Sequence, residues 1–370
     1  MSRHNYQYSE VPIDIVVPWV DGSDPDWLVE FNKYKKLEID SNIDSSDTEN
    51  TPNQSVTVHS SSEEQPAEFD AGEERYRDWD LLPYWFRAIE QNAPWVRKVF
   101  FVTWGHIPKW LNTDHPKIQI VRHDDYIPKQ YLPTFTSICI ELNLFRIPDL
   151  SEHFIYFNDD VYLTQQTCPE DFFVDGKPRD AAILGIIKQN NLQNFMPYTE
   201  LNMLGIINTE FSKPEVIHKN RRKWFSLKYR KALLKNLLLA KWSSVFTGFY
   251  NFHSCQPLKK STCREVWDKY GYILDKVCHH RFRTRNDINQ YLFRYWQICK
   301  GDFEPSAVKS DYFTIGQISV EKAREVLNDK SYNTVCVNDD DPEEMNFAYE
   351  QQQMRALFEE KFRQKSSFER

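Results

Sequence analysis

The sequence predicts an α/β fold: a Rossmann-like, mostly parallel sheet flanked by helices, with a mainly helical C-terminal half packed on it. Two features lead to this prediction. In the first half of the chain, short apolar segments rich in Val, Ile and Phe alternate with stretches of helical periodicity. Repeated strand and helix units with short connections build parallel sheets that are covered on both faces. Beyond about Ser212 the pattern becomes mainly helical.

The first expected strand is the apolar run IDIVVPWV at residues 13–20, which ends in the turn-forming DGSDPD. An unbroken apolar run is typical of a parallel strand that is buried on both faces. Ligands of open α/β sheets bind at the carboxyl ends of the strands. Asp21 and Asp24 are therefore candidate site residues, and Gly22 would let a phosphate approach the backbone. A tight strand-to-helix turn explains the same residues without a ligand.

A polar segment at residues 41–71 is dominated by Ser, Asn, Thr, Asp and Glu. Such a composition cannot bury enough apolar surface to order itself, so we expect a flexible insertion here. The insertion divides a Rossmann-like core made of residues 1–40 and 72–211. Residues 212–370 form the mainly helical part, which we expect to complete the functional site.

The remaining elements follow from the same periodicities. Helices are expected over residues 78–91, after Pro133-Thr134, and from Asp341-Pro342; strands are expected over 98–104, 117–123, 312–315 and 334–337. One further short strand, HFIYF, is followed directly by Asn158, Asp159 and Asp160.

The tripeptide Asn158-Asp159-Asp160 is the sharpest local signal of chemistry. Adjacent carboxylates at the end of a buried strand repel each other unless a cation or hydrogen-bond donors neutralise them. Mg²⁺ held by one or two carboxylates and by substrate phosphates meets that need, and a nucleotide diphosphate would complete the coordination. Because Asn and Asp are also common turn formers, a plain turn is the competing interpretation.

Three more residues are candidate catalytic groups. Glu141 lies in the apolar helical segment SICIELNLFRI, where it needs a task, such as accepting a proton, or a salt bridge to a residue such as Arg146. His253 follows the aromatic run FTGFYNF and is either catalytic or structural. Arg283 could hold two phosphate oxygens with its guanidinium, or it could simply be solvated at a helix start.

Composition excludes several functions. The formal net charge of −8 disfavours nonspecific nucleic-acid binding. The 7 cysteines are scattered without a CxxC pair, which argues against a disulfide framework and a zinc ribbon, so we expect reduced, mostly buried thiols. With no signal peptide and no run of about 18 apolar residues, a cytoplasmic location is expected.

The segment at residues 218–242 departs from the acidic balance, because it carries many Lys and Arg and no acidic residue. A helix of this kind could lie on an anionic membrane surface or hold a polyanionic substrate. The alternative is a helix packed on its apolar stripe with a solvated basic face. The stripe consists of Leu227, Leu234, Leu237, Leu238 and Trp242.

These segments, in this order, resemble the Stealth family. Its members include capsule and cell-wall polysaccharide phosphotransferases of bacteria and the animal enzyme that starts the mannose 6-phosphate tag. IDIVVPWVDGSDPDW resembles the first conserved region, and RYRDWDLLPYWF through NDDVYL and PEDFF resembles the second. The third is similar around TGFYNFHSCQPLKKS and FRTRNDINQYLF, and the fourth around VCVNDDD and FRQKSSFE.

The resemblance implies that an acceptor hydroxyl attacks the sugar-proximal phosphorus of a UDP-hexose or UDP-N-acetylhexosamine, with UMP leaving and a phosphodiester forming. It places the catalytic groups on Glu141, Asp160, His253 and Arg283. Donor contacts are expected at Trp19, Asp21, Gly22 and Asn338, and Mg²⁺, with Mn²⁺ as the alternative, at Asp159, Asp160 and Asp339. Where the family often has Asn-Asp-Glu-Leu, this chain has DWDLL at residues 78–82, which puts a substrate contact there in doubt.

Two other functions fit parts of the same pattern. A metal-dependent glycosyltransferase would use the Asn158–Asp160 motif for metal binding but attack the sugar carbon and release UDP. A noncatalytic glycan-binding protein would keep the fold without needing all four catalytic candidates. The expected acceptor is a glycan, and a lipid-linked glycan at the inner membrane face would suit the basic segment.

Overall fold

A five-stranded sheet forms the centre of the protein, for which the computed structural model describes residues 11–46, 69–72, 75–339 and 346–370. The strand order is β4-β3-β1-β5-β9. The strands are β1 (Ile13–Pro18), β3 (Val99–Thr103), β4 (Ile118–Arg122), β5 (His153–Tyr156) and β9 (Gln256–Lys259). The first four run parallel, and β9 is antiparallel to β5. The predicted mostly parallel sheet is therefore confirmed.

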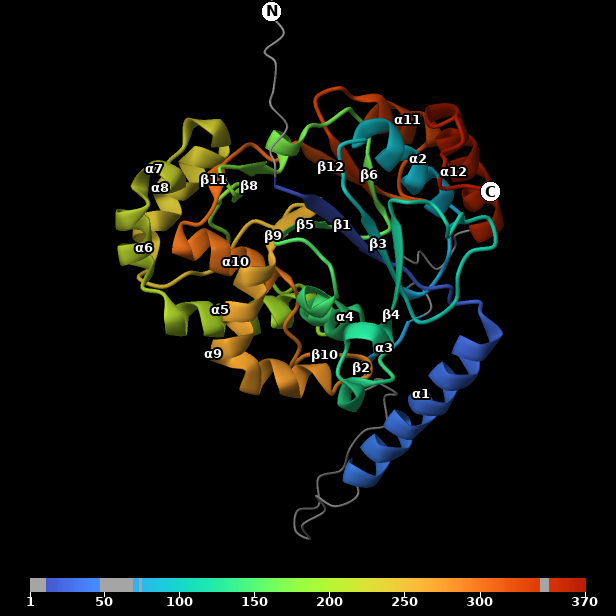
Figure 1. Cartoon of the computed structure of the whole chain (residues 1–370). Coiled ribbons are helices and arrows are strands. Elements are labelled where there is room, and N and C mark those ends of the chain that lie inside the picture. The colour runs from blue at the N-terminus through green and yellow to red at the C-terminus, as the bar shows by residue number, and fades with distance from the viewer. Residues whose placement is uncertain (1–10, 47–68, 73–74, 340–345) are drawn as a thin grey trace, which may run out of the picture.

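Both faces of this sheet are buried, which explains the unbroken apolar runs of its strands. Val16 and Phe100 point into one hydrophobic cluster, and Ile15 and Phe101 point into the other. Figure 1 shows the helices of the two clusters on opposite sides of the sheet. One side has α4 (Ser137–Asn143), α5 (Met196–Glu210), α9 (Lys260–Cys278) and α10 (Tyr291–Lys300); the other has α2 (Leu82–Asn92), α11 (Val320–Asn328) and α12 (Phe347–Lys361).

A second sheet places a strand from the C-terminal half next to the Asn158–Asp160 motif. It has the order β12-β13-β6 and consists of β12 (Ser310–Thr314), β13 (Thr334–Asn338) and β6 (Val161–Leu163). Strand β6 begins directly after Asp160, and the backbone N–H of Val337 donates to the carbonyl of Asp160 at 2.8 Å. The C-terminal half is thus mainly helical, as predicted, but it also contributes β9, β12 and β13.

The remaining elements lie at the periphery. A small sheet combines β7 (Phe173–Val174), β8 (Lys177–Asp180) and β11 (Glu304–Pro305). The short helices are α3 (His123–Tyr126), α6 (Lys213–Lys219) and α7 (Arg221–Trp224), with 3-10 turns at Lys129–Tyr131, Leu144–Arg146, Pro169–Asp171 and Leu227–Tyr229. Among the described residues, no helix is both long and apolar enough to cross a membrane.

Helix α1 (Pro25–Ser46) extends away from the body (Figure 1) and continues into the predicted insertion, because residues 41–46 are helical. At the other end of that insertion, β2 (Phe69–Asp70) pairs antiparallel with β10 (Arg283–Thr284). The rest of the insertion, residues 47–68, lies outside the described residues. The insertion therefore returns to the body directly beside Arg283.

One helix start differs from the prediction, and the predicted start of another lies outside the described residues. Helix α2 begins at Leu82 instead of residue 78, because Asp78 accepts a hydrogen bond from the backbone N–H of Asp80, whose φ is +60°, so the chain is not helical there. Helix α12 begins at Phe347, where the Asn346 side chain caps the N–H of Tyr349. The predicted start at 341–342 lies outside the described residues. The predicted strands correspond to β3, β4, β12 and β13.

The basic segment at residues 218–242 is not one helix but α6, α7, a 3-10 turn and α8 (Ala232–Trp242). Helix α8 packs on the body through the partly buried Ala232, Leu233, Leu239 and Ala240. The five residues of the predicted apolar stripe are all exposed. The prediction that this segment packs on that stripe is therefore wrong, because helix α8 turns its other side to the core.

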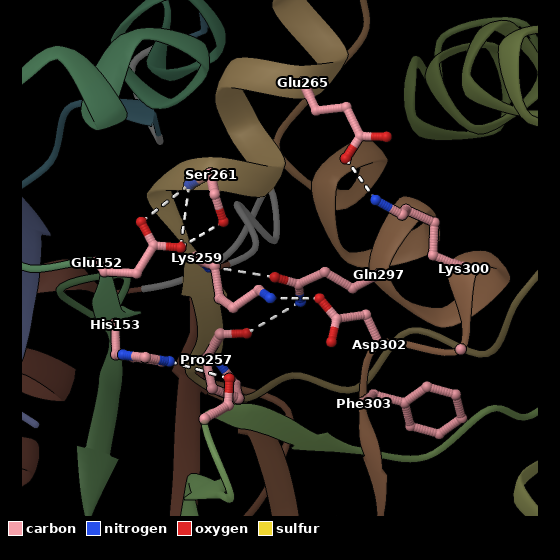
Figure 2. A network of polar contacts seen from close by, with 12 residues as sticks. Glu152, His153, Pro257, Lys259, Ser261, Glu265, Gln297, Lys300, Asp302 and Phe303 are labelled. Atoms are coloured by element: carbon pink, nitrogen blue, oxygen red, sulfur yellow. Dashed lines mark hydrogen bonds and ion pairs between the residues drawn. The ribbon is translucent and has the colours of Figure 1, made fainter.

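A polar network fixes the edge strand β9 to the two helices that follow it (Figure 2). The ammonium of Lys259 pairs with Asp302, and the Lys259 backbone N–H donates to Gln297 at 3.1 Å. Gln297 in turn donates to the carbonyl of Pro257 at 3.3 Å. Because β9 begins three residues after His253, this network also anchors one end of the loop that carries His253.

All seven cysteines are free, and six of them are buried, which confirms the expectation of unpaired, mostly buried thiols. Cys168 is the exposed one.

Candidate active site

Glu141 is a buried carboxyl held by a tyrosine of the central sheet. Helix α4 begins at Ser137, where Thr136 caps the N–H of Ile138, and its apolar side buries Glu141 to 7% exposure. The phenol oxygen of Tyr156, from β5, lies 2.8 Å from Glu141 Oε1 and 2.5 Å from Asn158 Oδ1. The Tyr156 hydroxyl donates to Glu141, so Tyr156 ties the helix carboxyl to the turn after β5.

Burial raises the pKa of Glu141, and the hydrogen bond from Tyr156 and the positive charge of Arg283 only partly oppose that rise. A raised pKa suits a group that exchanges a proton near neutral pH. The predicted alternative, a salt bridge between Glu141 and Arg146, is wrong. Arg146 donates to Asn143 at 2.9 Å and lies 4.7 Å over the ring of Trp267.

Arg283 reaches the same helix from β10. Its guanidinium donates to Ser137 Oγ at 3.1 Å, and Ser137 lies one turn before Glu141 on α4. Ser137 is its single hydrogen-bond partner within the described part of the chain. The surrounding protein lowers the pKa of the Arg283 guanidinium by desolvation, with Arg75 adding repulsion. A half-buried guanidinium with most of its donors unused can hold the oxygens of a phosphate.

Acidic side chains from three segments meet at the carboxyl edge of the sheet. The Asp159 side chain is exposed and the Asp160 side chain is half-buried. Nearby protein atoms nevertheless displace much of the water around both carboxyl groups. Desolvation, with the charges of Asp160 and Asp78, raises the pKa of Asp159 to about 7. Desolvation likewise raises the pKa of Asp160 to about 6 and that of Asp78 to about 6, the latter with the charges of Asp80 and Asp21. The charges of these carboxylates repel one another, and a bound cation would relieve that repulsion.

The chemistry of these carboxylates fits Mg²⁺. Among the described residues, no three His, Cys, Asp or Glu side chains are already arranged as a metal site. Mg²⁺ does not need one, because it binds through one or two carboxylates together with phosphates and water. Asp160 Oδ1 is buried without a hydrogen-bond partner among the described residues, while its Oδ2 accepts from Cys336 Sγ at 3.4 Å.

Asp339, the third predicted metal ligand, is engaged with protein groups. Its Oδ2 accepts from Trp79 Nε1 at 2.9 Å and lies 3.3 Å from Arg77 Nε. It therefore lies next to the segment of Asp78. Asn338, a predicted donor contact, is half-buried at the end of β13, and its carbonyl accepts from the N–H of Ile315.

Trp19 is part of the core rather than of an open surface. Its ring is 8% exposed and stacks on Phe101 with 5.6 Å between centroids. The edge of His106 packs against it at 5.2 Å, and His106 Nε2 accepts from the backbone N–H of Asp21 at 2.8 Å. Trp19 and His106 thus set the direction of the turn after β1.

Gly22 is required by the protein backbone itself. Its N–H donates to the carbonyl of Tyr76 at 3.1 Å, and a Cβ built on Gly22 would lie 2.2 Å from that oxygen. Tyr76 fills the space beside Gly22. The group that approaches the backbone of Gly22 closely, as the sequence indicated, is therefore Tyr76 of the same chain. Asp21 Oδ1 accepts from the N–H of Ser23 at 2.9 Å.

His253 lies in a neighbouring cavity. The imidazole is exposed, stacks on Tyr312 with 4.5 Å between centroids, and has a pKa lowered by desolvation. It lines a cavity of about 370 Å³ together with Glu200, Asn251 and Tyr291. A second cavity of about 210 Å³ also includes Tyr291.

Tyr291 connects His253 with the carboxylates. Burial is the main cause that raises the pKa of its phenol, and the charges of Glu141 and Asp160 add to that rise, which places Tyr291 within electrostatic reach of each. Glu141 therefore lies within electrostatic reach of Arg283, Tyr291 lies within reach of Glu141 and Asp160, and His253 lines one cavity with Tyr291.

Comparison with known proteins settles the family. Models of Stealth protein CR1, conserved region 1, and CR2, conserved region 2, match residues 11–36 and 75–180. Capsular polysaccharide phosphotransferase WcwK of Streptococcus pneumoniae is 38% identical over 97% of this chain and 99% of the relative. This chain belongs to the Stealth family.

Two more relatives are also named as polysaccharide phosphotransferases. An exopolysaccharide phosphotransferase of Lactiplantibacillus plantarum is 33% identical over 97% of this chain and 96% of its own. Receptor polysaccharide phosphotransferase WefC of Streptococcus gordonii is 36% identical over 88% of this chain and 90% of its own. These alignments extend well beyond the two conserved regions.

The two Stealth models cover the turn after β1 and the segment that contains Glu141, Asp159 and Asp160. His253 and Arg283 lie outside these models, so the assignment of the third and fourth Stealth regions stays a prediction. The resemblance stated from the sequence is confirmed for the family itself.

Sequence reasoning missed Asp78, Tyr156 and Tyr291. Tyr156 could have been found, because it lies two residues before Asn158 in an expected strand and alternate strand residues share a face. Asp78 belongs to the DWDLL segment, which departs from the family pattern, so the resemblance does not indicate it. Tyr291 carries no local signal, since its place beside the carboxylates depends on how α10 packs.

Proposed function

We propose that this Stealth protein transfers a hexose 1-phosphate or N-acetylhexosamine 1-phosphate from a UDP-sugar to a hydroxyl of a glycan. UMP leaves and a phosphodiester forms, in the synthesis of a cell-surface polysaccharide. The relatives named as capsular and exopolysaccharide phosphotransferases support this class of reaction. The observation that carries the proposal is the buried Glu141, which lies within electrostatic reach of Arg283 and is hydrogen-bonded to Tyr156. Tyr156 in turn lies within electrostatic reach of Asp159 and Asp160.

Arg283 binds the nonbridging oxygens of the transferred phosphoryl group. Negative charge spreads over these oxygens during phosphoryl transfer, and planar guanidinium donors match them in pairs. Partial burial strengthens this interaction, because the local dielectric is lower than that of water. Ser137 holds the guanidinium in place from α4.

Glu141 accepts the proton of the attacking hydroxyl. Its raised pKa brings it closer to neutrality, and Tyr156 orients it. His253 is the second candidate for this role, because its lowered pKa keeps the imidazole neutral at neutral pH and it faces the 370 Å³ cavity. That cavity is a suitable place for the acceptor sugar.

Asp160 and Asp159 would hold Mg²⁺, with Mn²⁺ as the alternative. When bound, the cation supplies positive charge that neutralises the diphosphate and stabilises the leaving UMP. The unused Oδ1 of Asp160 and the raised carboxyl pKa values support this assignment. The acceptor is a lipid-linked glycan at the inner membrane face.

The released nucleotide tests the proposal against a glycosyltransferase. The protein is incubated with a panel of UDP-sugars and glycan acceptors, with and without Mg²⁺, and the nucleotide is identified by chromatography. UMP together with a new phosphodiester ³¹P signal is expected. Release of UDP would make the protein a glycosyltransferase, and no nucleotide from any donor would favour a noncatalytic glycan-binding protein. Arg283→Ala is the matched inactive control.

A further inference from the structure

Helix α8 turns an apolar face to solvent. Leu234, Leu237, Leu238 and Trp242 recur at i, i+3, i+4 and i+8, so they share one side of the helix. Each of the four is between 49% and 73% exposed. Contiguous exposed apolar side chains of this size mark interaction sites. Figure 1 shows α8 with α6 and α7 at the outer edge of the molecule, away from α11 and α12.

The opposite side of α8 is fixed to the body, so the orientation is built into the fold. Asn236 is fully buried; its amide donates to the carbonyls of Ala182 and Trp224 at 2.6 and 2.8 Å and accepts from the N–H of Leu184 at 2.8 Å. The buried ammonium of Lys213 donates to the carbonyls of Leu239 and Ser243, both at 2.8 Å, at the C-terminal end of the helix.

Cations border this apolar side. Lys231, Lys235 and Lys241 are exposed and form no ion pair with any described residue. The segment at residues 218–242 contains no acidic residue, whereas the whole chain has a net charge of −8. Together with Leu234, Leu237, Leu238 and Trp242, these three lysines define what we call the α8 face.

The α8 face continues to the mouth of the cavity that contains His253. Lys235 lines that cavity, and its ammonium lies 5.3 Å over the ring of Tyr250. Ile186, Met196 and Tyr250 line the same cavity and are each at least 40% exposed. An apolar and basic surface thus surrounds one opening of the candidate active site.

We propose that the α8 face docks on an anionic lipid bilayer and that the His253 cavity opens at the bilayer surface. Leucine and tryptophan enter the boundary between headgroups and acyl chains, while lysines meet the anionic headgroups. A second copy is a poorer occupant, because a two-fold interface would place these lysines opposite their own counterparts. The cavity's role in receiving a lipid-linked acceptor rests on the proposed function, whereas binding to the bilayer does not.

Vesicle co-sedimentation of the full chain tests the docking. Binding is expected to vesicles that mix phosphatidylglycerol with phosphatidylcholine, and weak binding to phosphatidylcholine alone. The double variant L237S/L238S should weaken binding about tenfold, because two apolar side chains no longer enter the interface. K231Q/K241Q should weaken binding to the anionic vesicles by about tenfold or more and make it less sensitive to salt.

The matched control is L37S/I39S, which removes two exposed apolar side chains from α1. It should bind vesicles like the wild type. Equal binding by L237S/L238S and the wild type would overturn the proposal. A wild type that does not bind vesicles but forms a dimer, which L237S/L238S dissociates, would also overturn it. With an active enzyme, L237S/L238S should slow transfer to a lipid-linked acceptor but not to a soluble one. Failure of all UMP release would overturn the proposed reaction and leave the vesicle result standing.

Discussion

The phenol of Tyr156 lies 2.8 Å from Glu141 Oε1 and joins the end of strand β5 in the central sheet to the buried carboxyl of helix α4. This contact connects the residue expected to accept a proton with the turn expected to hold a cation, because Tyr156 also contacts Asn158.

Tyr156→Phe should shift the pH dependence of kcat. The hydrogen bond from Tyr156 lowers the pKa of Glu141, so its loss should raise that pKa further. If Glu141 acts as the base, the acidic limb of the kcat profile moves to higher pH and activity at neutral pH falls about 10- to 100-fold. Tyr131→Phe, which removes a hydroxyl bonded to Asp275, is the control and should leave the limb in place. An unchanged limb in Tyr156→Phe would exclude Glu141 as the base.

Arg283→Ala should lower the transfer rate about 10³-fold or more, because a key cationic contact to the phosphoryl oxygens is lost. Arg283→Lys should recover only part of the rate, since an ammonium cannot pair with two oxygens in one plane. Steady-state UMP release measures both variants. Arg146→Lys is the control, because Arg146 packs on Trp267 and does not contact Glu141. More than about a tenth of the wild-type rate in Arg283→Ala would contradict the role.

Mg²⁺ should raise the melting temperature more at about pH 8 than at about pH 5. The folded-state pKa values of Asp159 and Asp160 are raised to about 7 and about 6, from 3.8. Protons therefore compete with the cation at the lower pH. Thermal melts with and without Mg²⁺ measure the shift in melting temperature. Asp160→Asn is the variant that should lose this shift. An equal Mg²⁺ shift in Asp160→Asn would place the cation elsewhere.

The raised pKa values of Asp159 and Asp160 also predict how the stability of the metal-free protein changes with pH. Groups with raised pKa bind protons more tightly when folded, so their contribution to stability is complete below about pH 3.8 and is lost as the pH rises through about 6 to 7. Asp159→Asn should remove part of this loss. Chemical denaturation of both proteins across this pH range provides the measurement, and parallel curves would contradict the assignment.

Asn236→Ala should reduce the free energy of unfolding by about 2–4 kcal/mol, because three buried backbone groups lose their hydrogen-bond partner. Urea denaturation measures the change. Asn328→Ala, on the exposed side of α11, loses one hydrogen bond to the carbonyl of Arg324 and should cost less than about 1 kcal/mol. Similar losses in both variants would mean that Asn236 does not hold α8.

Local sequence patterns predicted much of the fold. The apolar runs of β1, β3 and β5 identify buried parallel strands, and the turn residues after them identify the edge where Asp21 and Asp159 lie. Glu141 was recognisable because a charge in an apolar helix needs a partner. Its partner was not recognisable, since Tyr156 reaches it only through the packing of α4 on the sheet.

The sequence by itself determined which segments become strands, that carboxylates follow β5, and that residues 218–242 are basic. Only the tertiary structure decided that β13 lies beside Asp160, that Arg283 approaches Glu141 through Ser137, and that the leucines of α8 face outward. The physical reason is the range of the forces involved. Periodicity records whether a residue is apolar, but which side of a helix is buried depends on distant partners such as the backbone groups that Asn236 satisfies.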